Sequence, residues 1–292
     1  MKSSGYIASL KSVETENIID LMFYRPIGYV VTRMLQPLGV TPNVVTVVSI
    51  FVGASAGYFF YMPDRISNMW GILVLVIANI LDCVDGQLAR LTGKKTTLGR
   101  ILDGVAGDIW FIAIYVGLAM RLSLQYGSYW FFLPAVISGL SHLVQSNVTD
   151  YYKTLHLFFI GGEKGTDFQS AEQVKRSGAA TGFGLQRLFY EAYKYYTKLQ
   201  ESVTPQLQTM LRTLRQRYGE DIPNNIRLTF RKQSKKIMRV IDLMTFNGRS
   251  IALFAIVLSD YVWMYLLYET IILNIVLITA INKHERMCAK IA

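Results

Sequence analysis

Long stretches without a charged side chain alternate with short polar segments along most of this chain. Residues 44–62, 66–81 and 122–149 contain no Asp, Glu, Lys or Arg, and residues 104–120 contain only Asp108. A helix needs roughly 20 apolar residues to cross a hydrocarbon core about 30 Å thick. These stretches therefore predict four membrane-spanning helices.

A further apolar region, 250–282, is long enough for a hairpin of two more spans. Asp260 and two neighbouring aromatic residues interrupt it, and such a cluster is typical of the membrane–water interface. We expect the turn there, with the fifth helix starting near Leu243 and the sixth running over about 262–282. The pattern thus predicts an all-α integral membrane protein with six transmembrane helices.

The segment before the first span has the pattern of an amphipathic surface helix. Residues 14–36 place apolar and charged side chains on different sides of one helix, as in helices that lie in the membrane interface. Pro37 and Gly39 end this pattern. Thr41 followed by Pro42 is a favourable helix start, because threonine caps a helix and proline suits its first turn.

A polar region between the fourth and fifth spans reads as a helical insertion. Residues 161–184 are rich in Gly, Ser and Thr and predict a loop, whereas 185–202, a segment starting at Thr204-Pro205, and 225–240 have helical spacing. The last of these is strongly basic, which favours contact with anionic lipid headgroups. Coverage of an active site and contacts in a dimer are the alternatives. The chain is therefore divided into four parts: 1–43, 44–150, 151–242 and 243–292.

The composition agrees with a membrane protein, because 52% of residues are hydrophobic and only 17% are charged, against about 25% charged in soluble domains. The 30 Lys and Arg residues are distributed as 4, 1, 4, 1, 17 and 3 over successive segments between the spans. Loops rich in Lys and Arg stay cytoplasmic. We therefore expect a multi-pass protein with both termini and the insertion in the cytoplasm, in the inner membrane if the cell is bacterial. The net charge of +10 is explained by topology rather than by nucleic-acid binding.

Two classes of secreted protein are disfavoured. The two cysteines, Cys83 and Cys288, are too few for a disulfide framework, and Cys83 lies in an apolar segment. Residues 1–40 lack a short apolar core followed by a small-residue cleavage site, so no cleaved leader is expected.

The candidate chemistry concentrates in residues 82–108, at the cytoplasmic ends of two apolar helices. Four aspartates lie there: Asp82, Asp85, Asp103 and Asp108. Carboxylates at such depth are costly and usually bind a cation, carry protons or contact a substrate. Asp82 and Asp85 are three residues apart and share a helix face. Oxygen ligands from two helices favour one or two Mg²⁺ or Mn²⁺ ions over Zn²⁺.

Small and basic residues follow the first pair of aspartates. Gly86 and Ala89 lack large side chains, so a bulky group can approach the backbone there. Arg90 adds a forked donor suited to phosphate. A divalent metal, an arginine and small residues together indicate a site for a diphosphate.

The spacing of this segment is also specific. It reads Asp82-x-x-Asp85-Gly86-x-x-Ala89-Arg90 and, eight residues later, Gly99-x-x-x-Asp103. This motif resembles the signature of the CDP-alcohol phosphotransferases (CDP-alcohol phosphatidyltransferases), integral-membrane enzymes that make phospholipid headgroup linkages. Thr41-Pro42-Asn43 before the first span resembles another habitual feature of that family. The resemblance covers residues 14–150 well and the last hairpin only by topology.

The family pattern closes with two aspartates separated by three residues, whereas four residues separate Asp103 from Asp108 and Gly107 occupies the expected position. On a regular helix a step of four leaves two side chains about 40° apart, and a step of five leaves them about 140° apart. A π-bulge near Gly104–Gly107 would turn Asp108 into the site, and such bulges favour functional sites. The alternative is that Asp108 lies outside the site.

The resemblance implies a metal-dependent transfer of a substituted phosphate from a CDP-linked donor to an alcohol, lipid or polar, with release of cytidine monophosphate (CMP). It implies Asp82, Asp85, Asp103 and Asp108 as metal ligands, and Asp108 also as the general base. It implies contacts to the nucleotide and its diphosphate from Gly86, Ala89, Arg90, Gly99 and Asn43. Candidate contacts to the acceptor are Arg249, His142 and Gln145, and we expect membrane lipids and a second copy of the chain as partners.

Two other functions remain open from the sequence. One is an enzyme of the same fold that transfers a phosphorylated headgroup from a phospholipid to a lipid alcohol such as diacylglycerol or ceramide, like an inositol phosphorylceramide synthase, in sphingolipid synthesis. Release of CMP separates it from the first. The other is an ion-coupled transporter, whose intramembrane carboxylates would bind the transported ion. The position of the aspartates at the cytoplasmic helix ends disfavours the transporter.

Overall fold

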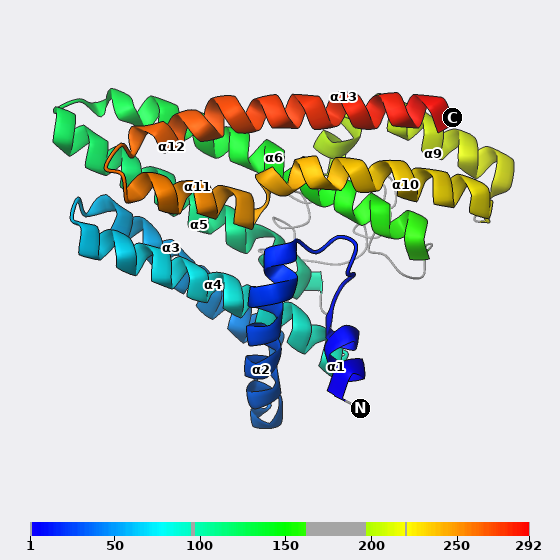
Figure 1. The fold of residues 1–292 in the computed structure, drawn as a ribbon, viewed down its shortest axis with the longest axis horizontal. Helices are drawn as coiled ribbons and strands as arrows, with labels where there is room; N and C mark the ends of the chain where they lie inside the picture. The colour runs from blue at the N-terminus through cyan, green and yellow to red at the C-terminus, as the bar shows by residue number, and fades with distance from the viewer. Residues whose placement is uncertain (1, 95–96, 162–196, 220, 292) are drawn as a thin grey trace, which may run out of the picture. The chain divides into compact units, whose positions relative to one another are not determined.

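A computed structural model describes residues 2–94, 97–161, 197–219 and 221–291, and these residues form helices and connecting turns with no strand among them. The described chain divides into two compact units, one of residues 1–144 and 246–273 and one of residues 145–245 and 274–292. The expectation of an all-α protein is confirmed for these residues (Figure 1).

The first unit contains the helices that carry the motif. In chain order they are α1 (Lys2–Ser9), the π-helix η1 (Asp20–Tyr24), α2 (Arg25–Leu35), the 3₁₀ turn η2 (Gln36–Leu38), α3 (Pro42–Tyr61), α4 (Arg65–Thr92), α5 (Thr97–Tyr126), η3 (Tyr129–Phe131), the first part of α6 (Phe132–Gly161), α11 (Phe246–Val257), α12 (Trp263–Leu267) and the π-helix η6 (Tyr268–Ile272).

The second unit contains the rest of α6, α9 (Pro205–Tyr218), α10 (Asn224–Ile241), η5 (Asp242–Met244) and most of α13 (Leu273–Ile291). The helices expected from residue 205 and over 225–240 are confirmed. The expected loop at 161–184 and most of the helix expected at 185–202 lie outside the described residues.

Five helices of the described chain are long and apolar enough to cross a membrane: Pro42–Tyr61, Arg65–Thr92, Leu102–Tyr126, Asn224–Val257 and Trp263–Ile291. The protein is therefore a multi-pass integral membrane protein. The expected fourth span, 122–149, is not among the five. Its residues are divided between the end of α5 and the start of α6, and the polar side chains of His142, Gln145 and Asn147 make α6 less apolar.

Glycines bring α3 and α5 into backbone contact. A Cβ atom on Gly117 would lie 2.1 Å from the carbonyl oxygen of Gly57, and one on Gly57 would lie 2.3 Å from that of Ala113. Spans in lipid usually pack closely through small residues at their crossings, because the hydrophobic effect does not favour helix–helix contacts over helix–lipid contacts. This close crossing fixes α5, and with it one half of the motif, against the α3–α4 pair.

The turns that join the spans differ in detail from the expectation. Asp64 caps α4 by accepting a hydrogen bond of 2.8 Å from the Ser67 amide, and its bonds with Ser67 lower the pKa of the Asp64 carboxyl. The predicted outer turn at 121–128 is wrong over 121–126, because α5 continues to Tyr126. Arg121 lies buried inside α5, where Nη1 donates to Asn68 Oδ1 (3.0 Å). Its hydrogen bonds allow the charge to sit inside the bundle.

A helix is present before the first span but starts later than the expected residue 14, and its place on the membrane surface stays a prediction. Residues 13–15 form a turn, and the helical path runs from η1 through α2. Met22, Val30 and Met34 are exposed on it, whereas Thr32 is buried. Gly39, in the left-handed region with φ of 71°, ends the segment, and α3 begins at Pro42 as predicted.

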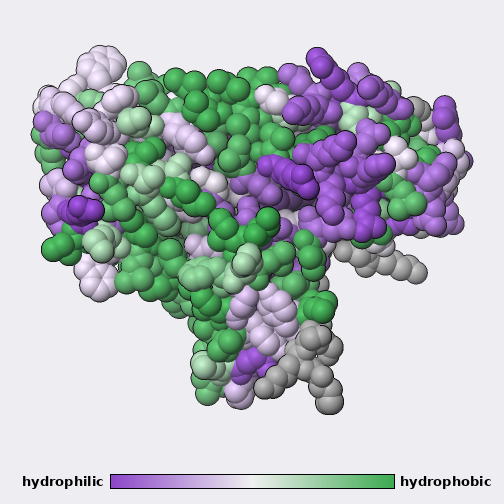
Figure 2. Space-filling model, viewed as in Figure 1, coloured by the Kyte–Doolittle hydropathy of each residue, from purple (hydrophilic) through white to green (hydrophobic). Residues whose placement is uncertain are grey.

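Helix α10 of the second unit is amphipathic. Phe230, Ile237 and Ile241 are buried, whereas Lys232 and Lys236 are exposed. Figure 2 shows hydrophilic side chains gathered over the α9–α10 part of this unit. Contact of this basic face with anionic lipid stays a prediction.

Candidate metal and phosphate site

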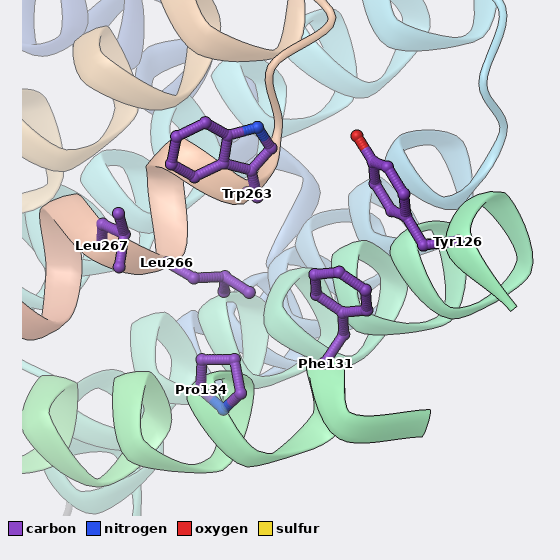
Figure 3. Close-up of a pocket in the computed structure, with 6 residues that line it drawn as sticks. All are labelled: Tyr126, Phe131, Pro134, Trp263, Leu266 and Leu267. Carbon is purple, nitrogen blue, oxygen red and sulfur yellow. The ribbon is translucent and has the colours of Figure 1, made fainter. Parts of the chain in front are cut away.

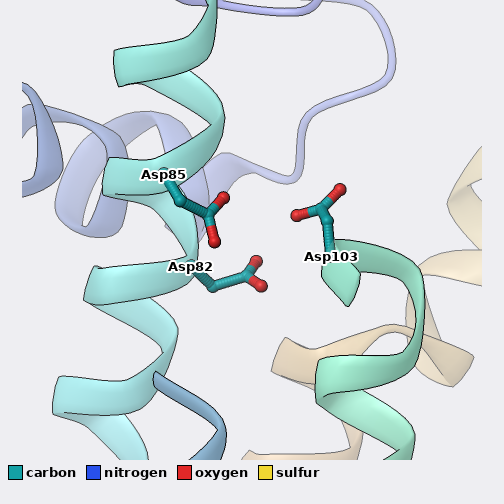
Figure 4. A group of neighbouring side chains, drawn as sticks. All are labelled: Asp82, Asp85 and Asp103. Carbon is teal, nitrogen blue, oxygen red and sulfur yellow. The ribbon is translucent and has the colours of Figure 1, made fainter. Parts of the chain in front are cut away.

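Three carboxylates converge between α4 and α5. Asp82 and Asp85 lie one turn apart on α4, Asp103 lies on α5, and one ligand oxygen from each falls within 4.8 Å of the others. Figure 4 shows the three side chains turned toward one another across the gap between the helices. The i, i+3 spacing accounts for the first pair, and the crossing of α5 supplies the third carboxylate.

The donor set fits a hard divalent cation. Asp85 is 3% exposed, and its Oδ2 is buried without a hydrogen-bond partner. A buried carboxylate oxygen without a partner is costly unless a cation or a ligand completes it. Oxygen ligands without nearby His or Cys suit Mg²⁺ or Mn²⁺. The structure thus brings together three of the four predicted metal ligands, Asp82, Asp85 and Asp103.

Arg90 lies one turn beyond Asp85 and is held by the N-terminal segment. Its Nε donates to the carbonyl oxygen of Ser9, and its Nη2 is buried with no partner. A Cβ on Gly86 would lie 3.1 Å from Arg90 Nη2. Glycine at this position therefore allows the guanidinium to lie back along α4 toward the aspartates.

Gln87 connects α4 to the two elements that precede the first span. It is fully buried, and its Nε2 donates to Ser9 Oγ (3.1 Å) and to the carbonyl oxygen of Arg25 (3.1 Å). A Cβ on Gly28 would lie 2.7 Å from Gln87 Oε1, so the missing side chain lets α2 approach α4. Neither Gln87 nor Ser9 could be recognised from the motif, because neither occupies a fixed position in it.

Asp108 is not part of the three-carboxylate group. Residues 97–126 form a continuous α-helix, so the predicted π-bulge near Gly104–Gly107 is wrong. A regular helix turns Asp108 about 140° away from Asp103. Its Oδ1 instead lies 3.2 Å from Nε2 of His142 on α6. Its role as a metal ligand or as the base stays a prediction.

Arg249 forms a buried ion pair with Glu269. Its Nη1 pairs with Glu269 Oε2, and the Tyr265 hydroxyl donates to Glu269 Oε1 (2.8 Å). Arg249 is 1% exposed and Glu269 0%. The charge of Arg249 is thus already balanced inside the bundle, and its expected contact with the acceptor stays a prediction.

The remaining predicted contacts are placed as follows. Ala89 and Gly99 are half-buried on α4 and α5, and Asn43 is half-buried in the first turn of α3. Gln145 belongs to the second unit, where its Nε2 donates to Asn274 Oδ1 (2.9 Å).

An apolar pocket of about 320 Å³ lies at the other end of α5 from the carboxylates. Figure 3 shows its lining of Tyr126, Phe131, Pro134, Trp263, Leu266 and Leu267. It offers no charged side chain, and Tyr126 follows Asp103 by more than six helical turns. This pocket is therefore not part of the carboxylate site.

The part of the chain that carries these residues is similar to a known protein family. Residues 39–169 match the CDP-alcohol phosphatidyltransferase family. This stretch contains the three converging aspartates and Arg90. Over these residues the chain is similar to the CDP-alcohol phosphatidyltransferase family.

Three curated members of this kind illustrate the likeness. An archaetidylinositol phosphate synthase of Pyrococcus horikoshii is 35% identical over 88 residues, 30% of this chain and 45% of the relative. A CMP-forming cardiolipin synthase of Streptomyces coelicolor is 38% identical over 55 residues, 19% of this chain and 26% of the relative. A CDP-diacylglycerol–glycerol-3-phosphate 3-phosphatidyltransferase of Salmonella typhimurium is 31% identical over 117 residues, 39% of this chain and 62% of the relative. The chain spans less than two thirds of the length of each.

Two residues outside the CDP-alcohol phosphatidyltransferase motif, Glu269 and Tyr115, contact the predicted residues Arg249 and His142 and were not predicted from the sequence. Glu269 is an acidic residue inside an apolar span, and the cost of such a charge is a signal that the sequence carried. Tyr115 is buried beside His142, but a tyrosine in an apolar helix gives no comparable signal.

Proposed function

We propose that this protein is a membrane phosphotransferase of phospholipid or sphingolipid synthesis. It moves a substituted phosphate from a CDP-linked donor to an alcohol and releases CMP. The observation that carries the proposal is the convergence of Asp82, Asp85 and Asp103 within 4.8 Å, in the stretch that matches the CDP-alcohol phosphatidyltransferase family. The relatives above, whose printed names include a CMP-forming synthase and a CDP-diacylglycerol-dependent transferase, support the same reaction class.

Asp82, Asp85 and Asp103 would hold one or two Mg²⁺ or Mn²⁺ ions. When bound, such a cation neutralises the diphosphate and stabilises the departing phosphate charge. The chain itself supplies the geometry, because two helices hold the carboxylates before any ligand arrives. Positioning and charge neutralisation contribute most of the acceleration in phosphoryl transfer.

Arg90 would bind the donor together with Gly86, Ala89, Gly99 and Asn43. The Ser9 carbonyl holds Nε of Arg90, which leaves the buried Nη2 to meet a phosphate oxygen. The N-terminal helix α1 would thereby set the direction of the guanidinium.

We assign Asp108 as the general base. Because the regular helix α5 turns it away from Asp103, it would take the proton of the acceptor without itself holding a metal ion. The acceptor hydroxyl has a pKa far above 7, so its proton must leave as the oxygen attacks phosphorus. The side chain of Asp108 is 14% exposed, whereas that of His142 behind it is 4% exposed. The carboxylate is therefore the member of the pair that an acceptor can reach.

The proposal also includes six membrane spans, of which α6 is the fourth in chain order. Both termini lie in the cytoplasm, and the protein forms a homodimer. The charge alternation along the chain supports this topology.

The test is a transfer assay with the purified protein in detergent. It uses Mg²⁺ or Mn²⁺, a panel of CDP-linked donors and alcohols that includes diacylglycerol and ceramide, and mass spectrometry of the products. Formation of CMP together with a phosphodiester product supports the proposal. Transfer from a phospholipid without CMP supports the headgroup-exchange alternative, and no transfer from any donor rejects both.

A further inference from the structure

One face of α5 joins Asp108 to a buried tyrosine. Asp108, Phe111 and Tyr115 are spaced by three and four residues and so lie on the same side of the helix. His142 of α6 packs against this face, with its ring centroid 4.8 Å from that of Phe111. Its Nε2 lies 3.2 Å from Asp108 Oδ1, and its Nδ1 lies 3.1 Å from the Tyr115 hydroxyl. Both ring nitrogens are thus engaged.

The exposure of these groups falls steadily along the series. The side chain of Asp108 is 14% exposed and that of His142 is 4% exposed, and Tyr115 is buried. A substrate can therefore reach the carboxylate but not the groups behind it. Tyr115 can influence the reaction only through His142.

The chemistry of the three groups fixes where the protons lie. An ionised carboxylate only accepts hydrogen bonds, so His142 must carry a proton on Nε2 to bond with Asp108. A neutral imidazole then has a lone pair on Nδ1 and needs a donor there. The Tyr115 hydroxyl is the group in position to donate.

Glu269 is the competing acceptor for the Tyr115 proton, because it and Arg249 also hydrogen-bond with this hydroxyl. However, Glu269 Oε1 already accepts from Tyr265 (2.8 Å), and Oε2 accepts from Arg249. Arg249 can only donate to the Tyr115 oxygen, so the hydroxyl proton goes either to Glu269 or to His142. Donation to Glu269 instead would leave the Nδ1 lone pair buried without a donor, at a cost of about 1–3 kcal/mol.

We propose that Tyr115 is a positioning residue for the transfer reaction, acting through His142 on Asp108. Its hydroxyl donates to Nδ1, which holds the ring in the tautomer whose Nε2–H donates to Asp108 Oδ1. This inference rests on the proposed function for its catalytic meaning. During transfer the acceptor O–H bond breaks, its proton passes to Asp108, the oxygen forms the new O–P bond, and the P–O bond to CMP breaks. His142 and Tyr115 keep the carboxylate oriented and exchange no atom with the substrate.

The kinetic test compares two buried tyrosines. Tyr115→Phe and Tyr152→Phe each remove one buried hydroxyl, but only the first removes the donor to His142, because the Tyr152 hydroxyl has no hydrogen-bond partner among the described residues. We expect Tyr115→Phe to lower kcat about tenfold or more, as loss of an orienting hydrogen bond does at other sites, with KM for the CDP-linked donor unchanged. Tyr152→Phe should keep kcat within about twofold of the unmodified enzyme. Equal losses in the two variants, or an unchanged kcat in Tyr115→Phe, would overturn the proposal.

The second readout does not depend on turnover. The chain has three histidines, so ¹⁵N imidazole spectra of the full-length protein in detergent contain few signals, and His142→Gln assigns the one of interest. We expect the His142 proton on Nε2 in the unmodified protein and in Tyr152→Phe, and a mixture of tautomers in Tyr115→Phe. A proton on Nδ1 in the unmodified protein would overturn the proposed hydrogen-bond direction. Absence of CMP formation with the expected tautomer would instead reject the proposed function.

Discussion

Single residues decide how the site can hold a cation. Asp85 is buried, Asp103 is exposed and Asp82 is intermediate, yet their oxygens converge. An exposed carboxylate gains little from an ion pair, whereas the buried oxygen of Asp85 needs one. Asp85 is therefore the ligand whose neutral replacement tests the metal site most directly.

Asp85→Asn should abolish transfer, lowering kcat by on the order of 100-fold or more, because electrostatic stabilisation at a reacting phosphate has that size. The fold should survive, since the amide has the same shape. Binding of Mn²⁺ measured by electron paramagnetic resonance should weaken in parallel. The matched control is Asp221→Asn, an exposed carboxylate outside the site, which should be unchanged. Full activity in excess chelator would contradict the metal requirement.

The Arg249–Glu269 pair is the largest buried charge feature outside the motif in the described residues. Both side chains are essentially inaccessible. Glu269→Gln leaves an unbalanced buried guanidinium and should destabilise the protein by about 3–5 kcal/mol. Thermal unfolding in detergent measures this loss. Replacing both residues by Met should recover much of it, because no uncompensated charge remains, and a Glu269→Gln protein as stable as the unmodified one would show that the pair is not needed.

At the scale of elements, helix crossings rather than helix ends set the site. α3 contacts both α4 and α5, and the glycines at its crossing with α5 allow backbone contact. Helices in lipid associate by such packing and by hydrogen bonds. Asp103 can meet Asp82 and Asp85 only while this crossing is kept.

Gly117→Ala tests the crossing. The new Cβ would lie 2.1 Å from the Gly57 carbonyl oxygen, so α3 and α5 must separate, at a cost of about 1–3 kcal/mol for overpacking. We expect a lower unfolding temperature and weaker Mn²⁺ binding. Gly139→Ala is the control, because its nearest neighbour, Tyr115 Cδ2, would be 3.8 Å away. Equal stability of the two variants would show that the crossing is adaptable.

At the scale of the whole molecule, charge distribution predicts orientation in the membrane. The segments rich in Lys and Arg should face the cytoplasm, together with the motif. Exposed residues on α10 are predicted to face the cytoplasm. Exposed residues at the turn after α5 are predicted to face the opposite side of the membrane.

Lys232→Cys and Tyr129→Cys test this topology in a background that lacks Cys83 and Cys288. Both positions are exposed in the described structure. A membrane-impermeant maleimide should label Tyr129→Cys in intact cells, and Lys232→Cys only after lysis. Labelling of Lys232→Cys from outside would reverse the orientation.

Much of the framework followed from local sequence properties. The start of α3 at Pro42, the turn at Asp260 and helix α10 depend on residues close together in the chain, where capping, proline and hydrophobic periodicity act. The pair Asp82 and Asp85 shares a face for the same reason. The motif spacing also sufficed to predict that Asp103 joins them.

What the sequence could not determine depends on contacts between distant residues. Arg121 was expected in a turn but lies buried, because Asn68 on the preceding helix α4 accepts a hydrogen bond from it and Asp260 pairs with its charge. Asp108 was expected to reach the metals through a π-bulge, but α5 stays regular and His142 of α6 binds the carboxylate instead. The sequence by itself determined most of the helices and the face that each aspartate occupies on a regular helix. Only the tertiary structure decided the partner of each polar side chain, because helix periodicity is local whereas the neighbour across a crossing depends on how helices pack.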